Sequence, residues 1–105
     1  MGSAVSNRRV RYKGRCMHIA GELTIYTAAE MHAAITAVLK RGRRIEAVDL
    51  SAVTGIDTAG LQILLLIRRT LGALERQMRV LNPSPAVSEL FELLQLQKQL
   101  PVGTD

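Results

Sequence analysis

The residues best suited to chemistry in this sequence are Asp57, Thr58, Ala59 and Gly60, at the expected start of an apolar helix. A hydroxyl in the first turn of a helix lies among backbone amides without intrahelical partners, near the positive end of the helix dipole. Such amides would accommodate a phosphate group on Thr58, and the added charge of roughly −2 would be felt by any partner bound there. The alternative is that Asp57 only caps the helix and Thr58 only fills its first turn. Taken alone, the residues favour this structural role.

No other group of residues has the pattern of a catalytic or metal site. Cys16, His18 and His32 are the only sulfhydryl or imidazole groups, and they lack the spacing of metal ligands, so we expect no metal. We expect His18 to pack at a strand face, His32 to lie on a helix surface and Cys16 to be a small core residue. The sequence has no Gly-x-Ser-x-Gly elbow, no Gly-x-x-x-x-Gly-Lys loop and no Gly-x-Gly-x-x-Gly fingerprint. We therefore expect neither an enzyme nor a bound cofactor.

The positive charge of the chain is concentrated near its N-terminus. Of the net charge of +5, all is supplied by the five basic residues between Arg8 and Arg15, because the nine others balance nine acidic residues. The cluster could bind an anionic partner such as nucleic acid or a lipid surface, or it could protect an exposed edge strand from pairing with other sheets. Because no nucleic-acid-binding motif accompanies it, we expect the edge strand and no nucleic-acid partner.

The length and composition are those of one domain. With 105 residues, 48% of them hydrophobic, the chain can bury a core of its own. The longest apolar run, 63–67, is far shorter than the roughly 20 residues of a membrane span, so we expect no membrane insertion. A single cysteine suits a reducing compartment and a cytoplasmic location. We expect a flexible N-terminus over 1–7, a domain over 8–98 and a flexible tail over 99–105.

Hydrophobic periodicity predicts alternating strands and helices. Strands are expected over 10–14, 16–20, 45–50 and 77–81, the first two joined as a hairpin by a turn at Gly14. Amphipathic patterns predict helices after Thr27, after Asp57 and after Ser84, with a polar loop over 51–55 between the third strand and the second helix. The order β β α β α β α requires a sheet that is at least partly parallel.

Each expected helix begins at a residue whose side chain can accept hydrogen bonds from unpaired amides. Thr27 and Glu30 have the spacing of a capping box, in which each residue bonds to the backbone of the other. Asp57 is the expected cap of the second helix. Ser84 is the expected cap of the third, with Pro85 at the first helical position, where a missing N–H costs nothing.

Four short segments, in this order along the chain, resemble the signatures of the STAS domain. They are 21–23 (Gly-Glu-Leu), 49–51 (Asp-Leu-Ser), 56–61 (Ile-Asp-Thr-Ala-Gly-Leu) and 82–87 (Asn-Pro-Ser-Pro-Ala-Val), and the likeness covers about 10–96. This fold is shared by bacterial anti-sigma-factor antagonists and the cytoplasmic tails of sulfate transporters. The resemblance implies an α/β fold with a small mixed sheet of four to five strands and helices packed mainly on one side.

The resemblance also implies a protein–protein switch. In antagonists of this family, a partner kinase that is also the anti-sigma factor phosphorylates the hydroxyl residue after the aspartate, and the unphosphorylated form binds that partner. By position the acceptor here is Thr58. The protein would be a monomer or a weak homodimer. The residues expected to bind the partner are Asp57, Thr58, Ala59, Gly60, Asp49 and Ser51.

The sequence departs from the usual Asp-Ser-Ser-Gly or Asp-Ser-Thr-Gly pattern, because Thr58 is followed by Ala59. This variant is similar to stand-alone STAS proteins of signalling clusters. It is also similar to the small STAS subunit of the bacterial phospholipid-transport ATPase, which need not be phosphorylated. Two kinds of partner stay open: an anti-sigma factor or histidine-kinase-like protein kinase, and an ABC transporter ATPase subunit. A sulfate-transporter tail is not expected, because no membrane segment precedes the domain in this sequence.

Overall fold

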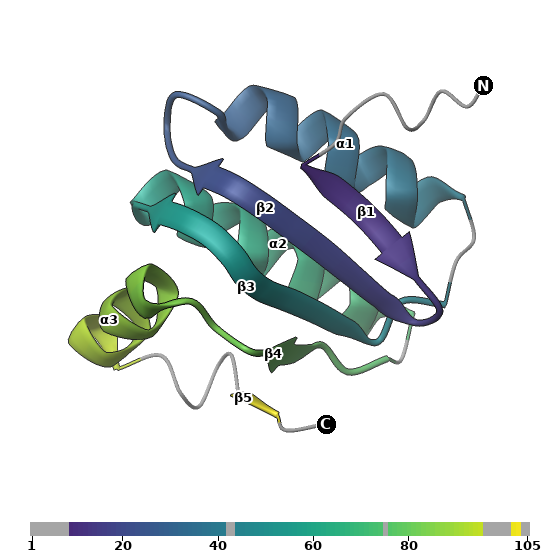
Figure 1. The fold of residues 1–105 in the computed structure, drawn as a ribbon. Coiled ribbons are helices and arrows are strands. Elements are labelled where there is room, and N and C mark those ends of the chain that lie inside the picture. The colour runs from purple at the N-terminus through teal and green to yellow at the C-terminus, as the bar shows by residue number, and fades with distance from the viewer. Residues whose placement is uncertain (1–8, 42–43, 75, 96–101, 104–105) are drawn as a thin grey trace.

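The computed structural model describes residues 9–41, 44–74, 76–95 and 102–103. Its five strands form one sheet in chain order, in which β1 is antiparallel to β2 and the other neighbours are parallel (Figure 1). The expected α/β fold with a mixed sheet is confirmed. In order, the elements are β1 (Val10–Lys13), β2 (Cys16–Leu23), α1 (Ala28–Lys40), β3 (Ala47–Ile56), α2 (Thr58–Ala73), β4 (Arg79–Leu81), α3 (Pro85–Leu94) and β5 (Val102–Gly103).

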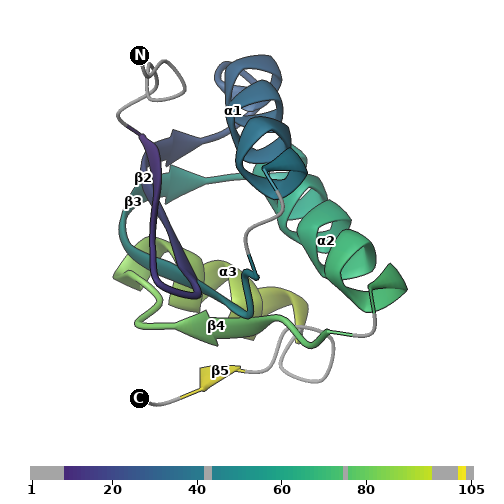
Figure 2. The same cartoon turned by 90° about the vertical axis from the view of Figure 1, so that its right-hand side faces the viewer.

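The helices are distributed unequally over the sheet. Helices α1 and α2 lie side by side on one face, and α3 lies beside the C-terminal part of β3 (Figures 1 and 2). The opposite face of β1 and β2 carries no helix (Figure 2). We call this the bare face. The predicted hairpin is confirmed, with Gly14 at a positive φ of 61° in its turn, and β1 is the expected edge strand.

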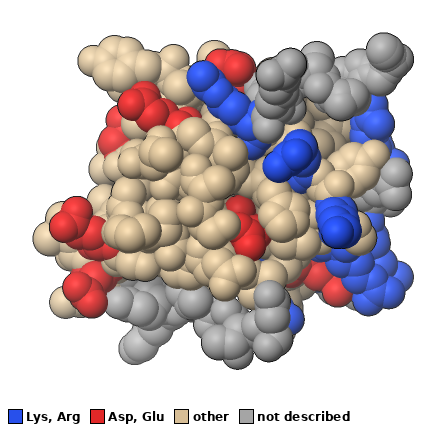
Figure 3. Space-filling model, in the orientation of Figure 1, with Lys and Arg blue, Asp and Glu red and all other residues tan. Residues whose placement is uncertain are grey.

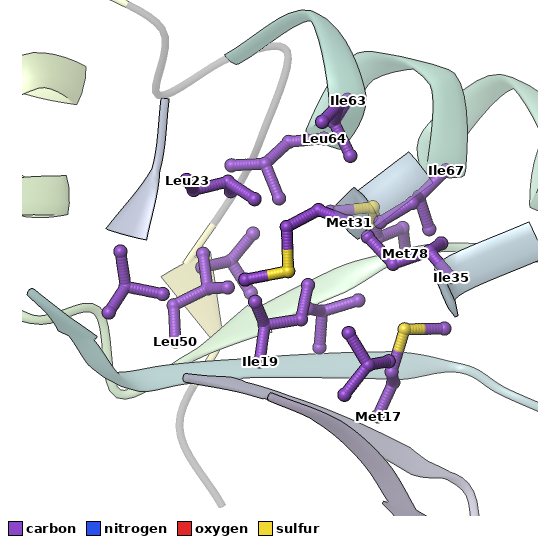
Figure 4. Close-up of a cluster of buried hydrophobic side chains, with 14 of the residues drawn as sticks. Met17, Ile19, Leu23, Met31, Ile35, Leu50, Ile63, Leu64, Ile67 and Met78 are labelled. Carbon is purple, nitrogen blue, oxygen red and sulfur yellow. The ribbon is translucent and has the colours of Figure 1, made fainter. Parts of the chain in front are cut away.

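The hydrophobic core lies between the sheet and the two covering helices (Figure 4). Strands β2 and β3 direct alternate residues into it, and α1 and α2 contribute residues at three- and four-residue spacing. Burial of each large aliphatic side chain stabilises the fold by about 1.5–3 kcal/mol. Helix α3 adds Val87 and Phe91. Residues at most 2% exposed include Met17, Ile19, Leu23, Met31, Ile35, Val48, Leu50, Leu64, Ile67 and Leu71.

The polar segment 51–55 is part of β3, so the prediction of a loop there was wrong. β3 continues to Ile56 because β2 continues to Leu23 beside it, pairing Glu22 with Gly55 and Leu23 with Ile56. Two register shifts between β2 and β3 accommodate the extra length. Polar residues are tolerated because this stretch is largely exposed, and only Val53 is buried.

The predicted capping box at α1 is also wrong. Thr27 makes no side-chain cap; its hydroxyl donates to the Glu22 carbonyl at 2.9 Å and accepts from the Thr24 amide at 3.0 Å. Glu30 does not reach back, because its carboxylate pairs with Arg9 at 3.2 Å. Thr27 therefore closes the β2–α1 connection, and its oxygen is not available to the helix.

The C-terminal tail contributes an element that the sequence did not predict. Strand β5 pairs in parallel with β4, with Val80 opposite Val102 and Leu81 opposite Gly103. Two residues are too few to show a strand pattern in a sequence. The segment 1–7 lies outside the described residues, so its flexibility and the domain limits of 8–98 stay predictions. None of the helices in the described ranges has the length and apolar character needed to cross a bilayer.

Candidate functional site

Asp57 caps α2, as the sequence predicted. Its backbone is extended, with φ −129° and ψ −169°, and its Oδ1 accepts hydrogen bonds from the amides of Ala59 at 2.9 Å and Gly60 at 3.1 Å. Two of the amides that begin the helix are thereby satisfied within the chain. The free amides that sequence reasoning offered to a phosphate on Thr58 are therefore already taken by a carboxylate.

The second oxygen of Asp57 reaches another part of the chain. Oδ2 accepts a hydrogen bond from the Ile25 amide at 3.0 Å, and the Asp57 amide donates to the Leu23 carbonyl at 3.3 Å. The hydrogen bond from Ile25, followed by those from Gly60 and Ala59, lowers the pKa of the Asp57 carboxyl below its usual value. Asp57 is therefore ionised at neutral pH and fixes the β2–α1 connection against the start of α2. Sequence reasoning missed Ile25.

Gly60 allows α2 to begin this close to β2. A Cβ at position 60 would lie 1.8 Å from the carbonyl oxygen of Leu23, a distance that no real side chain could occupy. Gly60 is buried, so its part in the site is to hold the helix against the end of β2. Any larger residue would push the start of α2 away from the sheet and would disturb the contacts of Asp57.

Thr58 is the first residue of α2 and is exposed. Its hydroxyl makes no hydrogen bond with any residue that the structure describes, and Ala59 behind it is half-buried. The Asp57–Ile25 hydrogen bond brings the β2–α1 connection alongside, and there Ile25 is 67% and Tyr26 91% exposed. An unused hydroxyl therefore lies next to apolar side chains that the fold itself leaves uncovered. We call Ile25, Tyr26, Asp57 and Thr58 the Thr58 surface.

A groove lies at the same end of the sheet. It has a volume of about 550 Å³ and runs between the end of β3 and one side of α3, where Leu93 is 75% exposed. Gly55 and Ile56 in the wall of the groove directly precede Asp57 in the sequence. The residues of the groove and those of the Thr58 surface are therefore consecutive at this point of the chain. Glu89 and Glu92 give the α3 side of the groove a negative charge.

Asp49 and Ser51 lie in the middle of β3, away from Thr58. Along an extended strand, the residues between Asp49 and Asp57 span roughly 25 Å. Asp49 is 9% exposed, and its Oδ1 accepts from the Ser51 hydroxyl at 2.7 Å and the Ser51 amide at 2.9 Å. Its Oδ2 accepts from the Asn82 side-chain amide at 2.9 Å. The structure therefore separates the six expected partner-binding residues into two groups.

The environment of Asp49 acts on its pKa in two directions. Burial by itself raises the pKa of this carboxyl, but the hydrogen bonds from Ser51 and Asn82, with a smaller contribution from His18, leave it below its usual value. The nearest atom of His18 is Nδ1, 4.0 Å from Oδ1. The contacts with Asn82 and His18 join β3 to the turn after β4 and to β2, and those with Ser51 lie within β3, so together they stabilise the sheet.

The remaining candidates from the sequence do not converge. His18 is half-exposed on the bare face and His32 is exposed on α1, as expected for both. Cys16 is half-buried rather than a core residue, because β2 turns it away from the helices; its Sγ lies 3.7 Å from the Met17 carbonyl oxygen. Within the described residues, no three His, Cys, Asp or Glu side chains lie close enough together to hold a metal ion.

Comparison with known proteins gives the family. The family described as "Mlab, STAS domain" matches residues 9–102. The chain belongs to the STAS domain family. A curated relative, the anti-sigma-B factor antagonist of Staphylococcus aureus, is 27% identical over 85 residues, which cover 81% of this chain and 79% of the relative.

Solved structures of STAS proteins agree with this fold. An anti-sigma factor antagonist from Mycobacterium paratuberculosis superposes with a TM-score of 0.73 at 29% identity, covering 89% of this chain and 80% of the other. A putative anti-sigma factor antagonist from Thermotoga maritima has a TM-score of 0.74 at 18% identity, covering 91% and 84%. This chain is thus similar in sequence and structure to proteins named as anti-sigma factor antagonists.

Proposed function

We propose that this STAS protein is a cytoplasmic binding module of the anti-sigma-factor-antagonist type. It has no catalytic role of its own. Through the Thr58 surface it binds a histidine-kinase-like anti-sigma factor or signalling kinase, and phosphorylation of Thr58 by that partner switches the binding off. The observation that carries the proposal is the exposed hydroxyl of Thr58, at a rigidly capped helix start and unused by the described part of the chain.

The neighbours of Thr58 explain how a phosphate would act. Because Asp57 already occupies the amides of Ala59 and Gly60, a phosphate on Thr58 gains little from the helix and remains on the surface. It adds about −1.5 to −2 charge beside a carboxylate that is itself ionised. A partner packed on the apolar side chains of Ile25 and Tyr26 would have to desolvate this charge, which opposes binding.

The test uses the chain with its cognate kinase-like partner and ATP, followed by intact-mass measurement. One phosphate is expected on the wild-type protein and none on Thr58→Ala. Thr54→Ala is the matched control, because Thr54 is also exposed and lies four residues away in β3. Detection of a phosphate on the Thr58→Ala variant would overturn the proposed switch. So would the absence of phosphate on the wild-type protein after incubation with a partner that binds this protein.

A second candidate is a small accessory subunit of an ABC-type phospholipid transporter, bound to its ATPase without phosphorylation. Two observations favour it: the description of the matching family, and the Ala59 that follows Thr58. In that case Thr58 is a contact residue only. Co-purification with an ABC-type ATPase that tolerates both Thr58→Ala and Thr58→Glu would select this candidate over the first.

A further inference from the structure

A second hollow lies on the bare face, at the hairpin end of the sheet. Its volume is about 360 Å³, and it is lined by Arg11, Tyr12, Lys13 and His18. The hairpin turn lies at the end of β2 opposite Leu23, so this hollow is remote from Asp57 and Thr58. Figure 3 shows Lys and Arg side chains gathered on the right-hand half of the bare face, where Figure 1 places β1 and the turn.

The strand register brings the side chains of Arg11, Lys13 and His18 together on the bare face. Val10 is buried, so alternation along β1 turns Arg11 and Lys13 to the bare face. Arg11 stands directly opposite His18 of β2, a pairing that holds the Cβ atoms about 5 Å apart. Lys13 is two residues further along the same face, about 7 Å from Arg11. Side chains of this length can reach a single small anion between them.

Within the described part of the chain, Arg11 and Lys13 keep their positive charges without an acidic partner. Neither residue forms an ion pair with a described residue, whereas Arg9 pairs with Glu30 at 3.2 Å. Asp49 lies beside the hollow, with its Oδ1 4.0 Å from His18 Nδ1, and its oxygens accept hydrogen bonds from Ser51 and Asn82. Its one negative charge is outweighed by the two positive charges of Arg11 and Lys13. The hollow is therefore a positively charged depression whose cations point into solvent.

We propose that this hollow binds a phosphate group, carried either by a free phosphate ester or by an anionic lipid headgroup. A guanidinium fork, an ammonium and an imidazole offer donors from several directions, which suits the several oxygens of a tetrahedral phosphate better than the two coplanar oxygens of a carboxylate. Protection of the sheet edge accounts for cations on β1. It does not account for the hollow or for His18, which lies on the inner strand β2.

The experiment measures phosphate binding by the full chain in two arms. In solution, inorganic phosphate and glycerol 3-phosphate are titrated while backbone amide shifts are followed by NMR. In the second arm, the protein is floated with vesicles of phosphatidylcholine alone and of phosphatidylcholine with phosphatidylglycerol. The variant is Arg11→Gln/Lys13→Gln. Its matched control is Arg68→Gln/Arg69→Gln, which removes the same charge from two exposed residues of α2.

The expected result is that shifts centre on residues 11–13 and 18, and that Arg11→Gln/Lys13→Gln weakens binding on the order of ten-fold or more. The control variant should bind within two-fold of wild type. Binding of glycerol 3-phosphate in solution identifies a free phosphate ester as the ligand, and binding only to phosphatidylglycerol vesicles identifies the headgroup. Absence of binding in both arms, or equal losses in the two variants, overturns the proposal. Neither result depends on Thr58 or on a protein partner.

Discussion

Asp49 and Asp57 lie within and just after the same strand, and each accepts at least three hydrogen bonds that lower its pKa. Asp49 is almost buried, and of its donors Ser51 lies in the same strand while Asn82 ties that strand to the turn after β4. Asp57 lies at the surface, and its donors are backbone amides of the segments that flank Thr58. The Asp49 carboxylate therefore stabilises the fold. The Asp57 carboxylate fixes the geometry of a surface and makes no hydrogen bond with the neighbouring Thr58 hydroxyl.

The STAS signature segments contain both aspartates, and this difference in burial and hydrogen-bond partners gives the two residues separate roles. In the sequence, both motifs carry polar side chains near the expected end of a strand or start of a helix, so spacing alone makes them look equivalent. The burial of Asp49 gives it a structural role. The exposure of Thr58, with Ile25 and Tyr26 beside it, supports the partner-binding role that we propose for the Thr58 surface. The four predictions below test this division, beginning with the largest expected effect.

Gly60→Ala should disrupt the start of α2 most severely. The added Cβ would lie 1.8 Å from the Leu23 carbonyl oxygen, so backbone must move, and we expect a loss of about 3 kcal/mol or more in the free energy of unfolding. Chemical denaturation measures it. Gly72→Ala, where a Cβ meets nothing within 4 Å, is the control and should stabilise the protein by about 0.5–1 kcal/mol. Equal stability of the Gly60→Ala and wild-type proteins would refute the close approach.

Asp49→Ala should destabilise the protein by about 1–3 kcal/mol, because the donors of Ser51 and Asn82 lose a nearly buried acceptor. Asp49→Asn keeps one oxygen acceptor and should cost less. Partner binding per folded molecule should be unchanged in both variants. A variant that stays fully stable but no longer binds would assign Asp49 to the interface instead.

The pH dependence of stability should carry the signature of Asp49. Its pKa in the folded state lies below the ordinary value of 3.8, so its charged form stabilises the fold above that pH, and this contribution is lost as the pH falls through the folded pKa. Wild-type protein should therefore lose more free energy of unfolding between about pH 5 and pH 3 than Asp49→Asn does. Parallel curves for the two proteins would show that the carboxylate is not stabilised by folding.

Asp57→Ala should have the smallest effect on stability and a larger one on binding. The change removes the acceptor for Ala59, Gly60 and Ile25, so the Thr58 surface should lose its fixed geometry while the core stays packed. Hydrogen exchange at the Ile25 amide should become faster, and affinity for the partner should fall. An unchanged exchange rate at the Ile25 amide together with an unchanged affinity would show that Leu23 and Gly60 alone position the Thr58 surface.

The local features of the fold could be read from the sequence. The cap at Asp57 and the Ser84–Pro85 start of α3 were predictable because each depends on residues only a few positions apart. Thr27 shows the limit of such reasoning. It has the correct spacing for a cap, but its hydroxyl is taken by the carbonyl of Glu22, and Glu30 is taken by Arg9.

The features that the sequence could not give depend on contacts between distant segments. Residues 51–55 form strand because β2 runs alongside them, and β5 exists only through its pairing with β4. The hydrogen bonds of Asp57 to Ile25 and of Asp49 to Asn82 join residues more than 30 positions apart. These contacts decide that the Asp57 segment is exposed and the Asp49 segment is not. The separation of the expected partner-binding residues into two groups could therefore be seen only in the structure.

The most direct test of the central claim is the affinity of one kinase-like partner for this protein before and after stoichiometric phosphorylation of Thr58, measured by isothermal titration calorimetry. We expect the phosphate, exposed beside the ionised Asp57, to weaken binding by on the order of a hundred-fold while the thermal unfolding midpoint stays nearly the same. Equal affinities of the two forms for that partner would contradict this expectation.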